Sequence, residues 1–203
     1  MIDNPALFDL IRTRRSIRRY NDQPIDRALI EAALSAATHA PSAHNRQPWR
    51  FAVVTTPEVK EQLASAMGER LRADRLADGD LPGVVDADVA RAHARITSAP
   101  ALVLACLTMA DMDKYSDAHR SNAERIMAIQ SVAAAIHNLL LAAHALGLAA
   151  CWMCAPLFAP GAVCDALDLP DDWEPQALVT LGYAAKAPKS KVIQPLTSRV
   201  VYR

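Results

Sequence analysis

One stretch decides how this sequence is interpreted: Pro41-Ser42-Ala43-His44-Asn45-Arg46-Gln47-Pro48-Trp49. Its polar, proline-containing composition is typical of a loop, and the apolar residues 51–54 that follow predict a short strand. Ser42, Asn45 and Gln47 carry groups that can hydrogen-bond the edge of a planar heterocycle. Loops on a rigid scaffold are common binding sites. Composition alone leaves a plain helix-to-strand connection equally open.

A second segment, near the N-terminus, is basic: Arg14-Arg15-Ser16-Ile17-Arg18. If this segment is extended, alternation places the side chains of Arg14, Ser16 and Arg18 on one side. Two guanidinium groups beside a hydroxyl suit a phosphate monoester and a nearby polar ring. The same residues also suit the solvated basic end of a helix. Taken alone, the segment favours this plainer interpretation.

Together the two segments resemble the FMN-dependent nitroreductase family, through Arg-x-Ser-x-Arg and then Pro-Ser-x-x-Asn-x-Gln-Pro-Trp. The resemblance continues through residues 144–148, Cys151-Trp152 and residues 181–183. It implies an oxidoreductase that passes a hydride from NAD(P)H or another reductant, through FMN, to a nitroaromatic, quinone or similar conjugated acceptor. It also implies an α+β, nitroreductase-like fold and a domain-entangled homodimer with FMN sites at the subunit interface.

The resemblance further implies which residues contact FMN. Arg14 and Ser16 would hold the phosphate and ribityl chain, and Arg18 would lie near the pyrimidine end of the ring and tune it. Arg15 belongs to the same segment. The other subunit would line the ring with its own loop, and the backbone after the third strand would approach the reactive ring nitrogen. The remaining implied contacts are Pro41, Ser42, Ala43, Asn45, Gln47, Ala155, Pro156, Leu157, Lys189 and Lys191. No catalytic side chain is implied, because the flavin carries the chemistry.

Two features depart from the commoner family pattern. Ala43 stands where a second Ser or Thr is frequent, and residues 155–158 lack the Glu-Gly often found near the flavin nitrogen. Residues 165–175 and 182–184 are similar to the FMN-binding C-terminal domain of the bifunctional glutamyl ligase of deazaflavin coenzyme biosynthesis. This likeness implies two alternatives: reduction of a dehydro precursor of that coenzyme, or flavin or deazaflavin binding without turnover.

Hydrophobic patterns predict a single α+β domain spanning residues 1–203, with a small mixed sheet flanked by helices. Strands are expected at residues 51–54, 101–107, 149–154 and 177–182. The longest helix, residues 117–146, has an apolar face wide enough to predict burial in a core or an interface. Apolar residues in the tail, 184–203, predict packing against a partner subunit.

Charge and composition narrow the functional classes. The 203-residue chain has 22 Lys and Arg against 22 Asp and Glu, so it has no general attraction to nucleic acid or to an anionic membrane. No secretory signal is visible, and His and Asn interrupt the apolar residues 133–150, which argues against a membrane span. A cytoplasmic protein with four reduced cysteines is expected.

No metal site is expected from the sequence. Cys151 and Cys154 form a Cys-x-x-Cys, but they lie in a predicted strand, where residues three apart face opposite sides. Zinc would need two further ligands. His137 and His144 share a helix face but have no nearby carboxylate in the sequence, which favours core or interface histidines. His44 is expected to be exposed on its loop.

Overall fold

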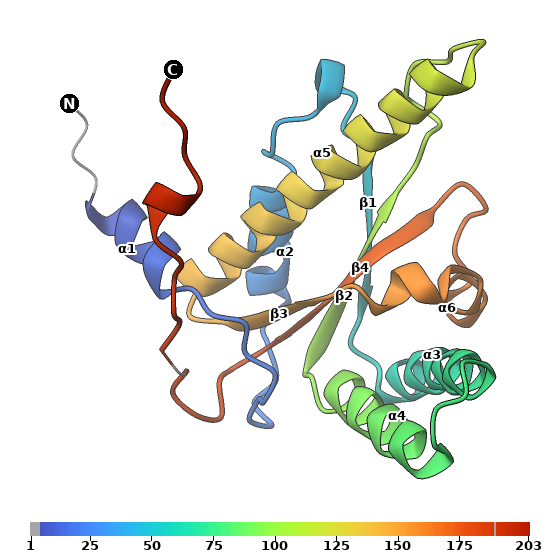
Figure 1. The fold of residues 1–203 in the computed structure, drawn as a ribbon. Helices are drawn as coiled ribbons and strands as arrows, with labels where there is room; N and C mark the ends of the chain where they lie inside the picture. Colours follow the sequence, from blue (N-terminus) through green and yellow to red (C-terminus); the bar gives the residue numbers. More distant parts are fainter. Residues whose placement is uncertain (1–4, 189) are drawn as a thin grey trace.

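The computed structural model describes residues 5–188 and 190–203, and a four-stranded sheet organises it (Figure 1). Its strands β1 (Trp49–Val54), β2 (Ala101–Leu107), β3 (Ala149–Met153) and β4 (Glu174–Gly182) lie in the order β1-β2-β4-β3. The fold class is as predicted, but the sheet is not mixed, because every pairing between its strands is antiparallel. In addition to these strand pairings, the described chain contains one parallel β-bridge, which joins Ser16 to Ala150 of β3.

Helices cover both faces of this sheet (Figure 1). On one face lie α2 (Arg27–Ala37) and α5 (Ala118–Ala145), and on the other lie α3 (Pro57–Ala77) and α6 (Pro160–Leu167), with α4 (Pro82–Thr97) packed on α3. The sequence of β2 is continuously apolar because both faces of the strand are buried: Val103 faces the α2–α5 core, whereas Leu104 faces the α3–α6 core. A strand buried on both faces needs no alternation of polar residues.

α5 begins and ends within one residue of the predicted boundaries. The Asp117 carboxylate accepts a hydrogen bond from Arg120 N at the start, and Gly147 follows the end with φ 79°. By length and composition α5 could cross a membrane. Its buried residues from Ala128 to Ala143, however, pack in the core beside the sheet, so α5 is a core helix of this fold.

One chain alone leaves considerable apolar surface exposed. α1 (Pro5–Thr13) has no buried residue, and Phe8 on it is 53% exposed. Ile126 and Ile129 are exposed on α5, and the tail around η3 (Leu196–Ser198) exposes Val192, Ile193, Leu196, Val201 and Tyr202. Figure 1 shows that α1 and the tail lie close together near the C-terminal end of α5. Exposed apolar patches of this kind mark interaction surfaces.

Candidate cofactor site

The basic segment lies along the edge of the sheet. Arg14 N still donates to Leu10 O at 3.1 Å, as in a last helical turn, and Ile17 N then donates to Ala150 O of β3 at 2.9 Å. The hydroxyl oxygen of Tyr20 lies 2.6 Å from Ile17 O and 2.7 Å from Thr180 Oγ1. Burial raises the pKa of Tyr20 well above its usual range, so the phenol stays neutral and fixes the segment against β4.

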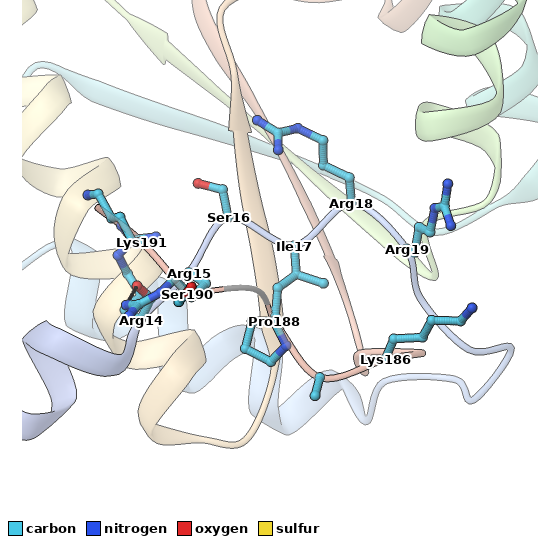
Figure 2. Close-up of a pocket in the computed structure, with 11 residues that line it drawn as sticks. Arg14, Arg15, Ser16, Ile17, Arg18, Arg19, Lys186, Pro188, Ser190 and Lys191 are labelled. Carbon is cyan, nitrogen blue, oxygen red and sulfur yellow. Dashed lines mark hydrogen bonds between the residues drawn. The ribbon is translucent and has the colours of Figure 1, made fainter. Parts of the chain in front are cut away.

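A groove of about 610 Å³ opens along this segment (Figure 2). Its wall combines the basic segment with the start of the C-terminal tail, and none of its residues is acidic. The lining residues are Arg14, Arg15, Ser16, Ile17, Arg18, Arg19, Lys186, Ala187, Pro188, Ser190 and Lys191. Because the cations converge on one space, the groove is suited to an anion.

The groove cations lack acidic partners. Among the described residues, no carboxylate forms an ion pair with Arg14, Arg18 or Lys191. Elsewhere arginines are paired, as in the two contacts between Arg125 and Glu174 at 2.5 and 2.7 Å. Unpaired guanidinium groups are free to form bidentate hydrogen bonds to a phosphate.

The predicted alternation of side chains along the segment is only partly correct. Figure 2 shows Ser16 and Arg18 pointing to the same side, whereas Arg14 lies further back beside Lys191. The cause is the helical hydrogen bond from Arg14 N to Leu10 O, which keeps Arg14 at the end of α1. The groove therefore has one end with Arg14 and Lys191 and another with Arg18.

His144, near the end of α5, lies close enough to Arg14 to be affected by its positive charge. Its Nε2 lies 2.9 Å from Thr13 Oγ1. Burial, and then the charges of Arg14 and Arg15, lower the pKa of His144 below its ordinary value. His137, by contrast, is exposed.

The loop of residues 41–49 is held mainly by its own polar groups. η1 (Ala43–Asn45) contains the left-handed residues His44 and Asn45, and Gln47 is also left-handed with φ 51°. Ser42 Oγ accepts from Gln47 N at 3.1 Å, and Ala43 N donates to Ser131 Oγ of α5 at 3.2 Å. The backbone shape is thus fixed before any ligand binds, while Asn45 and Gln47 remain exposed.

The two predicted halves of the site do not meet within one chain. The loop contacts α5 at Ser131, whereas Thr13, the residue directly before the basic segment, contacts α5 at His144. Thirteen residues of α-helix span roughly 20 Å. The structure therefore brings Arg14, Arg15, Ser16, Arg18 and Lys191 to one groove and places Ser42, Ala43, Asn45 and Gln47 elsewhere.

The third predicted group follows β3. Ala155, Pro156 and Leu157 form the short helix η2 (Ala155–Phe158), in which Pro156 is buried and Leu157 and Phe158 are exposed. Lys189 lies outside the described residues. The sequence prediction missed Arg19 and Lys186, which also line the groove. Lys186 could have been found, because residues 186–191 hold three lysines in six positions.

The cysteines behave as structural residues. All four are free, with Cys151 buried and Cys154 exposed, so the Cys-x-x-Cys forms no disulfide. Burial raises the pKa of Cys151 and raises that of Cys106 to about 12. A raised pKa disfavours the thiolate of Cys151, which argues against redox use of the Cys-x-x-Cys.

Comparison with known proteins decides the family. The family model described as "Nitroreductase family" matches residues 11–183. The chain belongs to the nitroreductase family. A Methanothermobacter thermautotrophicus protein, provisionally named an NADH dehydrogenase/NAD(P)H nitroreductase, is 29% identical over 91% of this chain and 81% of its own length. Nitrobenzene nitroreductase of Ectopseudomonas oleovorans is 44% identical over 73 residues, which are 36% of this chain and 32% of that protein.

Solved structures agree with this nitroreductase assignment. A provisionally named nitroreductase from Desulfovibrio desulfuricans, crystallised in complex with FMN, superposes with a TM-score of 0.74. It is 26% identical, and the alignment covers 99% of this chain and 98% of that one. The match therefore includes the basic segment, the loop of residues 41–49 and the tail.

Proposed function

We propose that this nitroreductase-family protein is an FMN-dependent oxidoreductase whose basic groove holds the FMN phosphate. The observation that carries the proposal is the set of groove cations without acidic partners, beside the Ser16 hydroxyl. The positive charge of the groove and its guanidinium, ammonium and hydroxyl donors suit a phosphate monoester. The FMN bound by the Desulfovibrio relative supports the same cofactor.

Each groove residue has a distinct role in this proposal. Arg14, Arg15 and Lys191 bind the phosphate, and Ser16 donates a hydrogen bond at the start of the ribityl chain. Arg18 lies at the opposite end of the groove from Arg14, where it would face the flavin ring. Bound FMN would supply two-electron hydride transfer. A cation at the pyrimidine end stabilises the negative charge of the reduced ring, so Arg18 favours reduction.

The complete site is proposed to require two subunits. The loop with Pro41, Ser42, Ala43, Asn45 and Gln47 lies too far along α5 to reach the groove of its own chain. A homodimer would bring this loop of one subunit to the groove of the other and would cover the exposed apolar residues of α1, α5 and the tail. The backbone of Ala155, Pro156 and Leu157 is proposed to approach the ring nitrogen, and Lys189 to add to the phosphate site.

The proposed reaction passes a hydride from NAD(P)H to a nitroaromatic, quinone or similar conjugated acceptor in the cytoplasm. The names of the two relatives support this donor and a nitroaromatic acceptor. Reduction of a dehydro precursor of the deazaflavin coenzyme is the second candidate, supported by residues 165–175. This segment joins α6 to β4, and its Asp172 accepts a hydrogen bond from Thr108 Oγ1 at 2.6 Å, so it also serves the fold.

A matched screen tests the proposal. The FMN-loaded protein is mixed with NADH or NADPH and then with a nitroaromatic, a quinone or the dehydro deazaflavin precursor. We expect about one FMN per chain, bleaching by a pyridine nucleotide and reoxidation by at least one acceptor. Turnover with the precursor alone would favour the second candidate. A protein that stays colourless after FMN reconstitution, or that releases FAD on denaturation, would contradict the proposal.

A further inference from the structure

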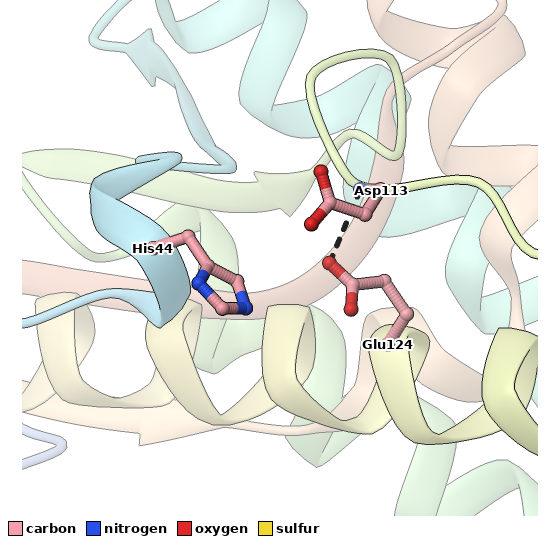
Figure 3. Close-up of side chains that lie close together, drawn as sticks. All are labelled: His44, Asp113 and Glu124. Atoms are coloured by element: carbon pink, nitrogen blue, oxygen red, sulfur yellow. Dashed lines mark hydrogen bonds between the residues drawn. The ribbon is translucent and has the colours of Figure 1, made fainter.

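Three side chains outside the groove form a compact cluster beside the N-terminal half of α5. His44 comes from η1, Asp113 from the connection between β2 and α5, and Glu124 from α5 itself. Each offers one ligand atom, and these atoms all lie within 4.8 Å of one another. Figure 3 shows the imidazole ring and both carboxylates gathered around one shared space.

Glu124 is the member of the cluster that points to a ligand. Its side chain is 0% exposed, and its Oε1 accepts from Asp113 N at 3.1 Å. Its Oε2 is also buried, and among the described residues it has no hydrogen-bond partner. Leaving a buried carboxylate oxygen without a donor or a cation is unfavourable. The same carboxylate supplies the ligand atom that lies within 4.8 Å of those of His44 and Asp113.

The protein's own cations do not satisfy this oxygen. Arg46 forms an ion pair with Asp113 Oδ1, and no described Lys or Arg forms one with Glu124. Among the described residues, the two carboxylates of the cluster thus have a single guanidinium partner, that of Arg46. A cation bound among the three ligand atoms would give the buried carboxylate of Glu124 a charged partner.

We propose that His44, Asp113 and Glu124 bind a divalent transition-metal ion, with Zn²⁺ as the best fit. One imidazole nitrogen with two carboxylate oxygens is a ligand set for Zn²⁺, whereas Mg²⁺ and Ca²⁺ prefer oxygen ligands alone. Zn–N and Zn–O distances of about 2.0–2.2 Å require the three atoms to draw closer. The exposed His44 ring, on its loop, can make that movement.

The ion would connect the loop of residues 41–49 to α5 and to the connection before it. His44 lies between Ser42 and Asn45, so the ion would add a link at the left-handed turn to the hydrogen bonds that already hold the loop. All three ligands belong to one chain, and the groove of Arg14 lies near the other end of α5. The proposal therefore does not rest on FMN binding. Sequence motifs could not predict it, because the three ligands are widely separated along the chain.

Metal binding to the full-length protein tests the proposal directly. Chelator-treated protein is titrated with Zn²⁺ by calorimetry, with and without FMN, and dialysed samples are analysed for bound zinc. We expect one ion per chain and an increase in the thermal unfolding midpoint on addition of Zn²⁺. His44→Ala and Glu124→Gln should each weaken binding by at least about tenfold. His39→Ala, which removes an exposed histidine outside the cluster, should bind as the parent does.

The variants separate this site from other zinc ligands. His44→Ala changes only an exposed loop side chain, so it stays informative even if Glu124→Gln disturbs folding. Equal zinc affinity in the parent and in His44→Ala would place the ion elsewhere, for example at the exposed Cys154, and would overturn the proposal. Absence of Zn²⁺ binding at millimolar concentration would overturn it as well. Neither result depends on flavin content or on turnover.

Discussion

The end of α5 and its middle carry two differently built regions. At the end, Arg14 lies beside Lys191 in a groove whose cations have no acidic partner among the described residues. Near the middle, the loop around Ser42 uses its polar groups on itself and on Ser131. The groove thus holds charge that only a ligand can neutralise, whereas the loop holds a shape that exists before binding. Substitutions in the groove should change affinity, and substitutions that separate the subunits should remove the site altogether.

The largest effect is expected from separating the two subunits of the proposed homodimer. Ile129 is 38% exposed on α5, between the buried residues Ala128 and Ser131 of the same helix. If the dimer covers this side chain, Ile129→Asp buries an unpaired charge at the interface and is strongly unfavourable. We expect sedimentation to show monomers and the purified protein to have lost its flavin.

The matched control for Ile129→Asp is Val84→Asp, which places the same charge on an exposed apolar position of α4. It should remain dimeric and yellow. A monomeric Ile129→Asp protein that keeps its FMN would show that the groove and the loop of residues 41–49 do not need each other. The division of the site between two subunits would then be wrong.

A smaller effect is expected within the groove. Arg14→Ala removes a charge-assisted contact to the phosphate worth about 1.5–3 kcal/mol, so FMN affinity should fall by roughly one to two orders of magnitude. Excess FMN should restore most turnover, because the ring-lining loop is unchanged. Flavin fluorescence titration and steady-state assays at saturating FMN measure the two quantities.

Arg12→Ala is the control for Arg14→Ala. Arg12 lies two residues earlier and lines no part of the groove, and its guanidinium pairs with Asp9 at 3.7 Å, with both side chains largely exposed. Its loss should leave FMN affinity unchanged. Equal loss of affinity in both variants would mean that general positive potential, and not the contact of Arg14, draws the phosphate.

Local signals predicted the elements well. Asp26 caps α2 by accepting from Ala28 N, and the uninterrupted apolar residues 101–107 coincide with β2. β4 begins at Glu174, before the predicted residue 177, because pairing with Leu107 and Cys106 extends it. Strand order and direction were not predictable in this way. They depend on which strands pair across the core, and this pairing is a tertiary property.

The candidate site shows the same limit. The family-like motifs identified Arg14, Ser16 and Arg18, and the structure places all three on one groove. Arg19 was missed, because it lies outside the motif and only folding shows that its side chain also lines the groove. The separation of the loop from the groove was implied by the resemblance and not by any residue pattern. The cluster of His44, Asp113 and Glu124 has no sequence signature, because three different elements supply its members.

The smallest expected effect concerns pH and the groove end of α5. Burial, and then Arg14 and Arg15, lower the pKa of His144 from its ordinary value of 6.5. The unfolded chain therefore binds this proton more readily than the folded one. The stabilising contribution of His144 is complete above pH 6.5 and is lost as the pH falls through the lowered pKa of His144 in the folded protein.

In His144→Gln, whose side chain can still contact Thr13, that loss of stability should be absent. Thermal unfolding midpoints of the flavin-free protein between pH 5 and 8 measure this, and the two proteins should diverge on the acid side by less than about 4 °C. Removing Arg14 should reduce the divergence, because one of the repelling charges is gone. Parallel curves for the parent and His144→Gln across the whole range would show that the groove cations do not act on His144, and the electrostatic contrast between the two regions of α5 would lose its support.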